Sequence, residues 1–314
     1  MNASARANSH PPLILEIKGN SLDDGPGIRS VVFFKGCPLA CLWCHNPESK
    51  RPGTEIGHDA TACIGCGTCI ESCPRGALSR DNPFFIDRAK CNLCFDCVEA
   101  CPTAALRRIG TPMAIPDIVA AVSRDKPFYD SSGGGVTLSG GEPTRAMDFA
   151  AELAQALKKA GFHILLETCG AFRLQAFKQM LYPFVDLIYF DLKLMDDRAH
   201  QHYCGAANKI ILDNFSQLHQ SAALGGVPIL PRIPLIPGIT ATPANLGATA
   251  AFLKRCGADR AQLLPYHPLW QAKNRTIGMP PPADGPTAAL GQWLSPQALS
   301  ECAAVFTREG IAVC

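Results

Sequence analysis

The sequence predicts an α/β protein in which short apolar strands alternate with helices, and in which a cysteine-rich segment interrupts the alternation. Two observations support this fold class. Six short apolar runs recur along the chain, and segments with helical periodicity separate the later ones. Between residues 51 and 111 this pattern stops and cysteine becomes frequent. A chain of 314 residues that is 47% hydrophobic is long enough for a large core and one smaller unit.

The expected strands are rich in β-branched, leucine or aromatic residues and cover residues 31–34, 136–138, 164–166, 187–190, 229–233 and 262–264. The expected helices cover residues 146–160, 174–182, 208–223 and 243–255. Such repeats imply parallel strands with right-handed crossovers. Six units fit either a doubly wound sheet or an incomplete β/α barrel, and periodicity does not choose between them. In both, chemistry belongs at the C-terminal strand ends.

Charge and hydropathy exclude several classes of function. The 29 basic and 27 acidic residues nearly balance, so we expect no nucleic-acid surface. No uninterrupted apolar run approaches the ~18–20 residues that span a bilayer, and we expect no membrane contact. The polar start lacks a signal peptide, so we expect a soluble cytoplasmic protein with reduced thiols and a flexible N-terminus over residues 1–11.

Cysteine is concentrated in one part of the chain, since 11 of the 16 lie between Cys37 and Cys101. CIGCGTCIESCPRGAL from Cys63 recurs as CNLCFDCVEACPTAAL from Cys91. Each copy reads C-x2-C-x2-C-x3-C-P, the spacing typical of bacterial two-cluster ferredoxins, in which the fourth cysteine binds the other cluster. The expected ligand sets are therefore Cys63, Cys66, Cys69 and Cys101 for one 4Fe–4S cluster, and Cys91, Cys94, Cys97 and Cys73 for the second. The alternative is a pair of zinc sites.

A third group, Cys37, Cys41 and Cys44, follows the first strand with the spacing C-x3-C-x2-C. No fourth cysteine is near, so these thiolates would leave one iron of a 4Fe–4S cluster open to another ligand. A zinc site completed by His45 is the alternative. His45 directly follows Cys44, a spacing that rarely lets both side chains reach one tetrahedral metal.

The three-cysteine motif, with Trp43 before its last cysteine, resembles the radical S-adenosylmethionine (SAM) signature. The surrounding motifs are DGPGIRSVVFFKGC, FYDSSGGGVTLSGGEP, LETCG, FDLK, RIPLIPG and PYH. Together, over residues 13–275, they resemble the glycyl radical enzyme activating enzymes, which include the pyruvate formate-lyase activase. The two-cluster insert is similar to that of the activases serving other lyases.

This resemblance implies a partial (β/α)6 barrel core over residues 12–51 and 112–314, and a ferredoxin-like insert over residues 52–111. It implies catalytic roles for Cys37, Cys41, Cys44, Lys193 and His267. The implied SAM contacts are Trp43, Ser139, Gly140, Gly141, Glu142, Glu167, Thr168, Asp191, Lys193, Arg232 and His267. Asp24, Gly25 and Gly27 resemble the loop that receives the glycine segment of the partner.

The resemblance further implies an oxidoreductase of anaerobic metabolism with three 4Fe–4S clusters, SAM and, in some members, a monovalent cation. Reductive cleavage of SAM would give a 5′-deoxyadenosyl radical that takes a hydrogen from a glycine in the C-terminal loop of a glycyl radical enzyme. A flavodoxin or ferredoxin would supply electrons, and we expect a monomer. The alternatives are a radical SAM enzyme acting on another peptide or small molecule, and a pure iron–sulfur electron carrier.

Some of these residues also have structural explanations. Asp191 and Lys193 lie two apart on one strand face and could form a buried ion pair. His267 could be a packing residue, whereas Arg232 in an apolar strand needs an anionic partner. The scattered cysteines are expected to be small hydrophobic residues: Cys169, Cys204, Cys256, Cys302 and Cys314.

Overall fold

The structure is a computed structural model that describes residues 12–280 and 288–314. The flexible N-terminus expected for residues 1–11 lies outside the described residues. The central sheet is built from β1 (Leu13–Ser21), β2 (Arg29–Phe34), β5 (Thr111–Pro112), β6 (Gly135–Gly140), β7 (Ile164–Thr168), β8 (Leu187–Asp191), β9 (Ile229–Leu235), β10 (Arg260–Pro265) and β11 (Ala312–Val313). Its order is β11-β10-β9-β8-β7-β6-β2-β1-β5.

Parallel pairing runs without interruption from β2 to β11, and β1 pairs antiparallel with both β2 and β5. Chain order and sheet order agree along this parallel run, so each crossover reaches the adjacent strand. All six residues of β2 are buried, as expected for a strand covered on both faces. The C-terminal ends of the parallel strands therefore meet at one edge of the sheet.

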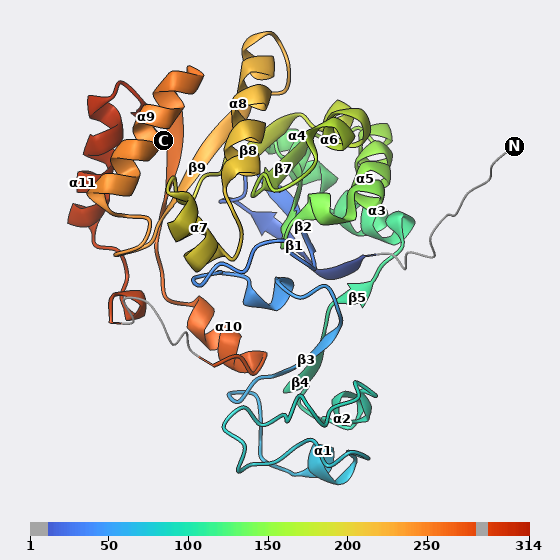
Figure 1. Cartoon of the computed structure of the whole chain (residues 1–314). Helices are drawn as coiled ribbons and strands as arrows, with labels where there is room; N and C mark the ends of the chain where they lie inside the picture. The colour runs from blue at the N-terminus through green and yellow to red at the C-terminus, as the bar shows by residue number, and fades with distance from the viewer. Residues whose placement is uncertain (1–11, 281–287) are drawn as a thin grey trace, which may run out of the picture.

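Helices connect and cover the strands (Figure 1). They are α3 (Ile115–Ser123), α4 (Lys126–Ser132), α5 (Met147–Lys159), α6 (Leu174–Met180), α7 (Asp197–Cys204), α8 (Lys209–Ala223), α9 (Pro243–Cys256), α10 (Trp270–Thr276) and α11 (Pro296–Arg308). The six predicted strands and four predicted helices are confirmed, with ends within a few residues. Among residues 12–280 and 288–314, no helix is long and apolar enough to cross a bilayer.

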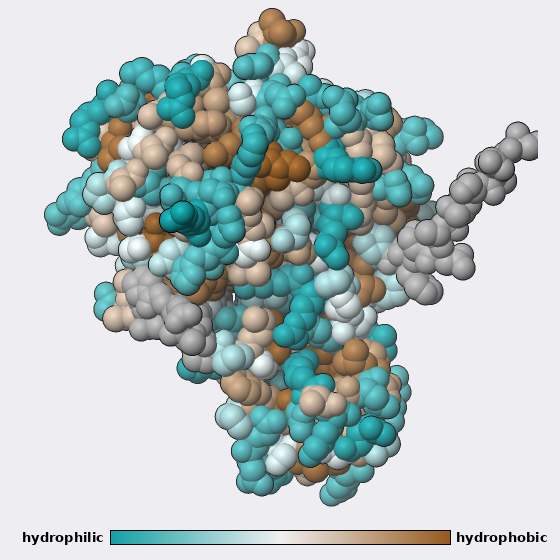
Figure 2. All heavy atoms as spheres, viewed as in Figure 1, coloured by the Kyte–Doolittle hydropathy of each residue, from teal (hydrophilic) through white to brown (hydrophobic). Residues whose placement is uncertain are grey.

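The cysteine-rich segment projects from one end of the main body as a separate lobe (Figures 1 and 2). It contains β3 (Glu55–His58), α1 (Thr68–Glu71), α2 (Asp96–Glu99) and β4 (Leu106–Ile109), and β3 pairs antiparallel with β4. A small core of its own includes Ile56, Leu78, Ile86 and Leu106. The chain rejoins the main sheet at Thr111, which pairs with Ile14.

The sequence repeat is also a repeat of backbone conformation. Gly65, Gly67 and Gly76 have positive φ angles of 70°, 86° and 54°. Their counterparts 28 residues later are Leu93, Phe95 and Ala104, with φ angles of 59°, 69° and 53°. Non-glycine residues rarely adopt this conformation because Cβ approaches the backbone. The second copy thus has the same backbone conformation as the first at these three positions, although none of its three residues is glycine.

Candidate active site

The loop after β2 carries Cys37, Cys41 and Cys44, and backbone hydrogen bonds fix it on two sides. The Gly36 and Cys37 N–H groups donate to the Ser49 and Lys50 carbonyls at 2.6 and 3.0 Å. On the other side, the Ala40 N–H donates to the carbonyl of Cys204 at the end of α7, at 2.8 Å. The three cysteines are therefore held at the C-terminal edge of the sheet.

Burial and neighbouring groups set the acidity of these thiols. A hydrogen bond with the Cys204 thiol lowers the pKa of Cys41 to about 7, whereas burial raises the pKa of Cys44 to about 12. Iron is bound by thiolates, so metal binding must displace the Cys44 proton. His45 is engaged away from the cysteines: its Nε2 lies 3.1 Å from the His267 carbonyl, and the two ring centroids are 4.2 Å apart with the planes tilted by 31°.

The SGGEP loop at the end of β6 touches the start of the cysteine loop through its backbone. The Gly141 N–H donates to the Phe34 carbonyl at 2.8 Å, and the Glu142 N–H donates to the Gly36 carbonyl at 2.9 Å. A Cβ on Gly141 would lie only 2.3 Å from the Gly36 oxygen. Glycine is required here because the two loops meet backbone to backbone.

The Glu142 side chain points into the protein, where it joins this loop to the end of β7. Its carboxylate accepts hydrogen bonds from Thr144 Oγ1 at 2.6 Å, Thr168 Oγ1 at 3.0 Å and the Cys169 N–H at 2.7 Å. Glu142 is 1% exposed and Thr168 is 3% exposed. The carboxylate of Glu142 and the hydroxyl of Thr168 are therefore occupied by protein partners, an arrangement that positions the loops around the site.

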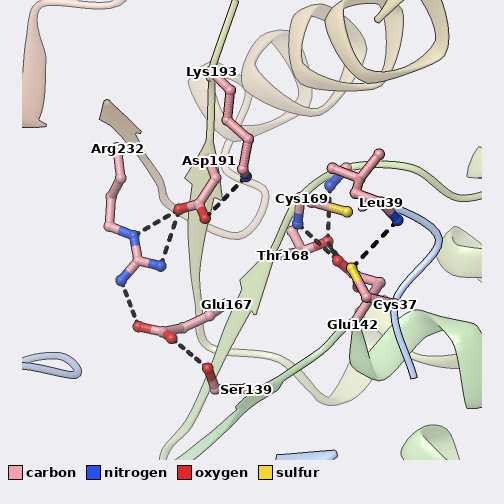
Figure 3. A network of polar contacts seen from close by, with 11 residues as sticks. Cys37, Leu39, Ser139, Glu142, Glu167, Thr168, Cys169, Asp191, Lys193 and Arg232 are labelled. Atoms are coloured by element: carbon pink, nitrogen blue, oxygen red, sulfur yellow. Dashed lines mark hydrogen bonds and ion pairs between the residues drawn. The ribbon is translucent and has the colours of Figure 1, made fainter. Parts of the chain in front are cut away.

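A continuous chain of polar contacts crosses four neighbouring strand ends (Figure 3). Ser139 Oγ donates to Glu167 Oε2 at 2.5 Å, and the Arg232 guanidinium bridges Glu167 and Asp191. Lys193 Nζ lies 3.2 Å from the other Asp191 oxygen. The structure thus brings together five predicted site residues, and Asp191 and Lys193 do form the ion pair considered above.

Burial and the ion pairs act in opposite directions on these groups. Burial raises the pKa of Glu167, and the charge of Arg232 offsets this only in part. Burial also acts to raise the pKa of Asp191, but Arg232 and Lys193 outweigh it and hold that pKa below its usual value. Of the two carboxylates, Asp191 is therefore the one more strongly held in its ionised form. It contacts both Arg232 and Lys193.

The Asp24–Gly27 loop lies against the inner part of the same sheet. The Asp24 carbonyl accepts a hydrogen bond from Thr137 Oγ1 at 2.8 Å, and the Asp24 charge helps raise the pKa of Glu167. A Cβ on Gly25 would lie 2.6 Å from Leu165 Cδ1, and one on Gly27 would lie 2.5 Å from the Gly134 nitrogen. The Asp24–Gly27 loop, which the sequence predicts to receive the glycine segment of the partner, is therefore packed closely against the sheet and lies near Glu167.

Arg29 holds this loop in place. Its fully buried guanidinium donates to Thr137 Oγ1 at 2.6 Å, to the Val136 carbonyl at 2.8 Å and to the Pro26 carbonyl at 3.2 Å. Burial lowers its pKa to about 10. The sequence signal for this residue is an arginine at the start of an apolar strand, which requires partners inside the protein.

His267 has no hydrogen bond to the polar chain among the described residues. Its ring centroid lies 4.2 Å from that of His45 and 5.6 Å from that of Trp293, and its Nδ1 is buried without a hydrogen-bond partner among the described residues. Trp43, which is 3% exposed, belongs to the core. The contacts of these two residues in the described parts of the chain are with aromatic and apolar neighbours.

The eight cysteines of the insert gather at two cavities. One cavity, of about 870 Å³, has Cys63, Cys66, Cys69 and Cys101 in its lining, together with residues of α10. The other, of about 10 Å³, is lined by Cys73, Cys91, Cys94 and Cys97. Each cavity thus collects three cysteines of one repeat and the fourth of the other. Within the described ranges, no three His, Cys, Asp or Glu side chains converge as on a single metal ion.

Comparisons with known proteins agree with this arrangement. A family model described as "4Fe-4S dicluster domain" matches residues 62–105, and one described as "4Fe-4S single cluster domain" matches residues 23–68. A radical SAM methyltransferase from Sphaerobacter thermophilus has a similar structure, with a TM-score of 0.52 at 14% identity over 98% of this chain and 78% of that one. This likeness shows a radical SAM-type α/β fold.

Two curated relatives cover most of the chain. An isethionate sulfite-lyase activating enzyme from Nitratidesulfovibrio vulgaris is 39% identical over 267 residues, 83% of this chain and 86% of its own length. A trans-4-hydroxy-L-proline dehydratase activating enzyme from Clostridioides difficile is 38% identical over 266 residues, again 83% of this chain and 86% of its own. Both alignments are long enough to include the main sheet as well as the insert.

Proposed function

The chain belongs to the activating enzymes of glycyl radical enzymes, and we propose from this premise which of its residues carry out the reaction. It is a radical SAM enzyme that uses SAM and iron–sulfur chemistry to activate a glycyl radical enzyme. The observation that carries this conclusion is the 39% identity to an activating enzyme over 83% of the chain. The residue roles below are supported by the geometry of the site.

Cys37, Cys41 and Cys44 would hold the catalytic 4Fe–4S cluster. Their donor set fits such a group, because three thiols share one fixed loop and His45 is engaged elsewhere. When bound, the reduced cluster supplies the electron that cleaves SAM, and the resulting 5′-deoxyadenosyl radical removes a hydrogen from the partner's glycine. The protein supplies orientation and exclusion of water.

The polar chain across the strand ends would orient SAM. Lys193 and Arg232 are both fixed by Asp191, so they can present positive charge to a carboxylate without further ordering. The backbone of Ser139, Gly140 and Gly141 would line the site, while Glu142 and Thr168 would hold the loops from behind.

The insert would hold two further 4Fe–4S clusters, one on Cys63, Cys66, Cys69 and Cys101 and the other on Cys91, Cys94, Cys97 and Cys73. The two cysteine-lined cavities support this crossed assignment. The reconstituted protein should then contain about twelve irons, from three clusters of four. Zinc with little iron would overturn the assignment. A flavodoxin or ferredoxin would deliver the electrons.

The core would be a partial (β/α)6 barrel over residues 12–51 and 112–314, with residues 52–111 as the ferredoxin-like insert. The unreversed strand order from β2 to β10 supports the barrel, because a doubly wound sheet reverses its order at a switch point. We further propose that the protein acts as a cytoplasmic monomer and that Asp24, Gly25 and Gly27 contact the incoming glycine loop.

The substrate of the partner lyase is a separate question. Relatives that activate isethionate sulfite-lyase, trans-4-hydroxy-L-proline dehydratase, choline trimethylamine-lyase and benzylsuccinate synthase are 39%, 38%, 35% and 38% identical to this chain. Because these sequence identities are so similar, they favour no single partner lyase. The test is anaerobic incubation of the reconstituted protein, SAM and reductant with each lyase, followed by electron paramagnetic resonance. A glycyl radical signal in one of them is expected, and deoxyadenosine without any such signal would overturn the proposal.

A further inference from the structure

Two arginines of the insert occupy equivalent positions in its sequence repeat. Arg80 follows Leu78 by two residues and Arg108 follows Leu106 by two residues, so the arginines are 28 residues apart, as the repeated cysteines are. Leu78 and Leu106 are both buried in the small core of the insert, whereas both arginines are exposed. The repeat therefore extends beyond the cysteines to one arginine in each copy.

Arg80 contacts the loop that carries the first three cysteines of the first copy. Its Nη2 donates a hydrogen bond to the carbonyl of Gly65, which lies between Cys63 and Cys66. A Cβ on Gly67, the residue after Cys66, would lie 3.6 Å from the same nitrogen. Arg80 also lines the cavity that collects the first ligand set. Its guanidinium is therefore held against the residues on both sides of Cys66.

Arg108 contacts the corresponding loop of the second copy. Its guanidinium carbon lies 3.6 Å from the centre of the Phe95 ring, which is a cation–π contact. Phe95 is the counterpart of Gly67 and lies between Cys94 and Cys97. Each copy thus places an arginine against the residue that follows its second cysteine.

The positive charge of these side chains is not neutralised by a nearby carboxylate. In the parts of the chain that the structure describes, neither Arg80 nor Arg108 forms an ion pair. Reduction of a 4Fe–4S cluster adds one electron and therefore one negative charge. A nearby cation stabilises the more negative state, and charge is one of the factors that set an iron–sulfur potential.

We propose that Arg80 and Arg108 are positioning residues: each fixes a positive charge against a ligand loop and thereby raises the reduction potential of the cluster bound by the first three cysteines of its own copy. The inference rests on the proposed function, since it requires both clusters of the insert. An exposed arginine can also simply cover apolar surface with its stem. Charge and packing are separable, because lysine keeps the charge without the planar guanidinium, and glutamine keeps an amide donor without the charge.

The experiment is a redox titration of the reconstituted Arg80→Gln, Arg80→Lys, Arg108→Gln and Arg108→Lys proteins. The insert clusters are followed by the part of the electron paramagnetic resonance spectrum that does not change when SAM is added. Each glutamine variant should shift one reduction step to a more negative potential, and the two variants should shift different steps. A tenfold change in the one-electron equilibrium corresponds to about 59 mV, and we expect a shift of up to about this size. The lysine variants should lie nearer the parent, and all differences should narrow at high salt because both arginines are exposed.

Arg107→Gln is the matched control. Arg107 is also exposed and directly precedes Arg108 on β4, where successive side chains point to opposite faces. The control removes the same charge from the same strand, and its potentials should remain those of the parent. An equal shift in this variant would overturn the proposal, because net charge alone would then explain the effect.

Iron content and circular dichroism check assembly in every variant, and the two arginines provide independent tests if one variant fails to fold. An unchanged potential in a folded glutamine variant would overturn the role of that arginine. Lysine variants that shift as far as the glutamine variants would also overturn the proposal, because charge would then not be the cause. If the parent protein lacks the roughly eight irons of the insert, the cluster assignment of the proposed function fails instead.

Discussion

The buried ammonium of Lys35 lies 2.7 Å from Glu55 Oε2 and so joins the end of β2 to the first strand of the insert. Their side chains are 0% and 8% exposed. Lys35 Nζ also donates to the Glu48 carbonyl at 2.6 Å. At the other end of the insert, a Cβ on Gly110 would lie only 2.4 Å from Lys35 Cδ. Both connections of the insert therefore close around one lysine.

Replacement of Lys35 should lower the stability of the folded protein. In Lys35→Met, Glu55 keeps, among the described residues, its ion pair with Arg51 alone, at 3.0 Å. We expect a loss of about 3 kcal/mol from the free energy of unfolding. Urea unfolding followed by circular dichroism measures this. Arg51→Ala is the matched control, because that side chain is 58% exposed and its pair should contribute less than about 1 kcal/mol. Equal losses in the two variants would contradict the role of Lys35.

The positive φ angles of the second repeat predict opposite effects at two matched positions. Ala104 is exposed with a φ of 53°, so Ala104→Gly should stabilise the insert by about 0.5–1 kcal/mol. Its counterpart Gly76 has a φ of 54° and open space around it, so Gly76→Ala should destabilise by a similar amount. The readout is the temperature at which iron–sulfur absorbance is lost. A change of the same sign in both variants would refute the strain argument.

Removal of one catalytic thiol should affect the catalytic cluster and leave the two clusters of the insert in place. Cys41→Ala is expected to abolish SAM cleavage and to leave about eight irons, since the insert has its own ligands. Deoxyadenosine formation and iron content are the two measurements. Cys314→Ala, at an exposed thiol, serves as the control and should retain cleavage and all of the iron. Cleavage by the Cys41 variant would show that the three-cysteine assignment is wrong.

Loss of the bridging guanidinium should destabilise the strand ends. Arg232→Met leaves Glu167 and Asp191 without their shared partner, and we expect a loss of about 3–5 kcal/mol together with weaker SAM binding. Adding Glu167→Gln should recover part of the stability, because it removes one unpaired carboxylate. Denaturant unfolding and equilibrium SAM binding report the two effects. No recovery in the double variant would argue against direct pairing.

His163 should make the protein less stable in mild acid. Its Nδ1 lies 3.3 Å from a nitrogen of Arg29, and burial followed by the Arg29 charge lowers its pKa below the usual value near 6.5. The unfolded chain therefore binds the proton first, so stability is highest above pH ~6.5 and falls as the pH decreases towards the folded pKa. His163→Gln should flatten this part of a stability–pH curve. An unchanged slope would exclude His163 as its source.

The sequence predicted the parallel strands well because their apolar runs reflect burial on both faces. It did not predict β1, since LILEIKGNS mixes polar residues with apolar ones. Cysteine spacing indicated which thiols would gather, because short loops constrain neighbouring ligands. The inward turn of Glu142 has one local partner, Thr144, two residues further along the chain. Its other partners, Thr168 and Cys169, are 26 and 27 residues away, and only the folded sheet brings them together.

The antiparallel pairing of β3 with β4 has a consequence for how such a chain can change. His58 and Leu106 are partners in this ladder, so the loops that carry the eight cysteines leave β3 and reach β4 one strand spacing apart, about 4.8 Å. A deletion between them, closed by a two-residue turn, would leave an ordinary β-hairpin. The cysteine-bearing loops can therefore be inserted or deleted between these two paired residues, with no shift of register in the main sheet.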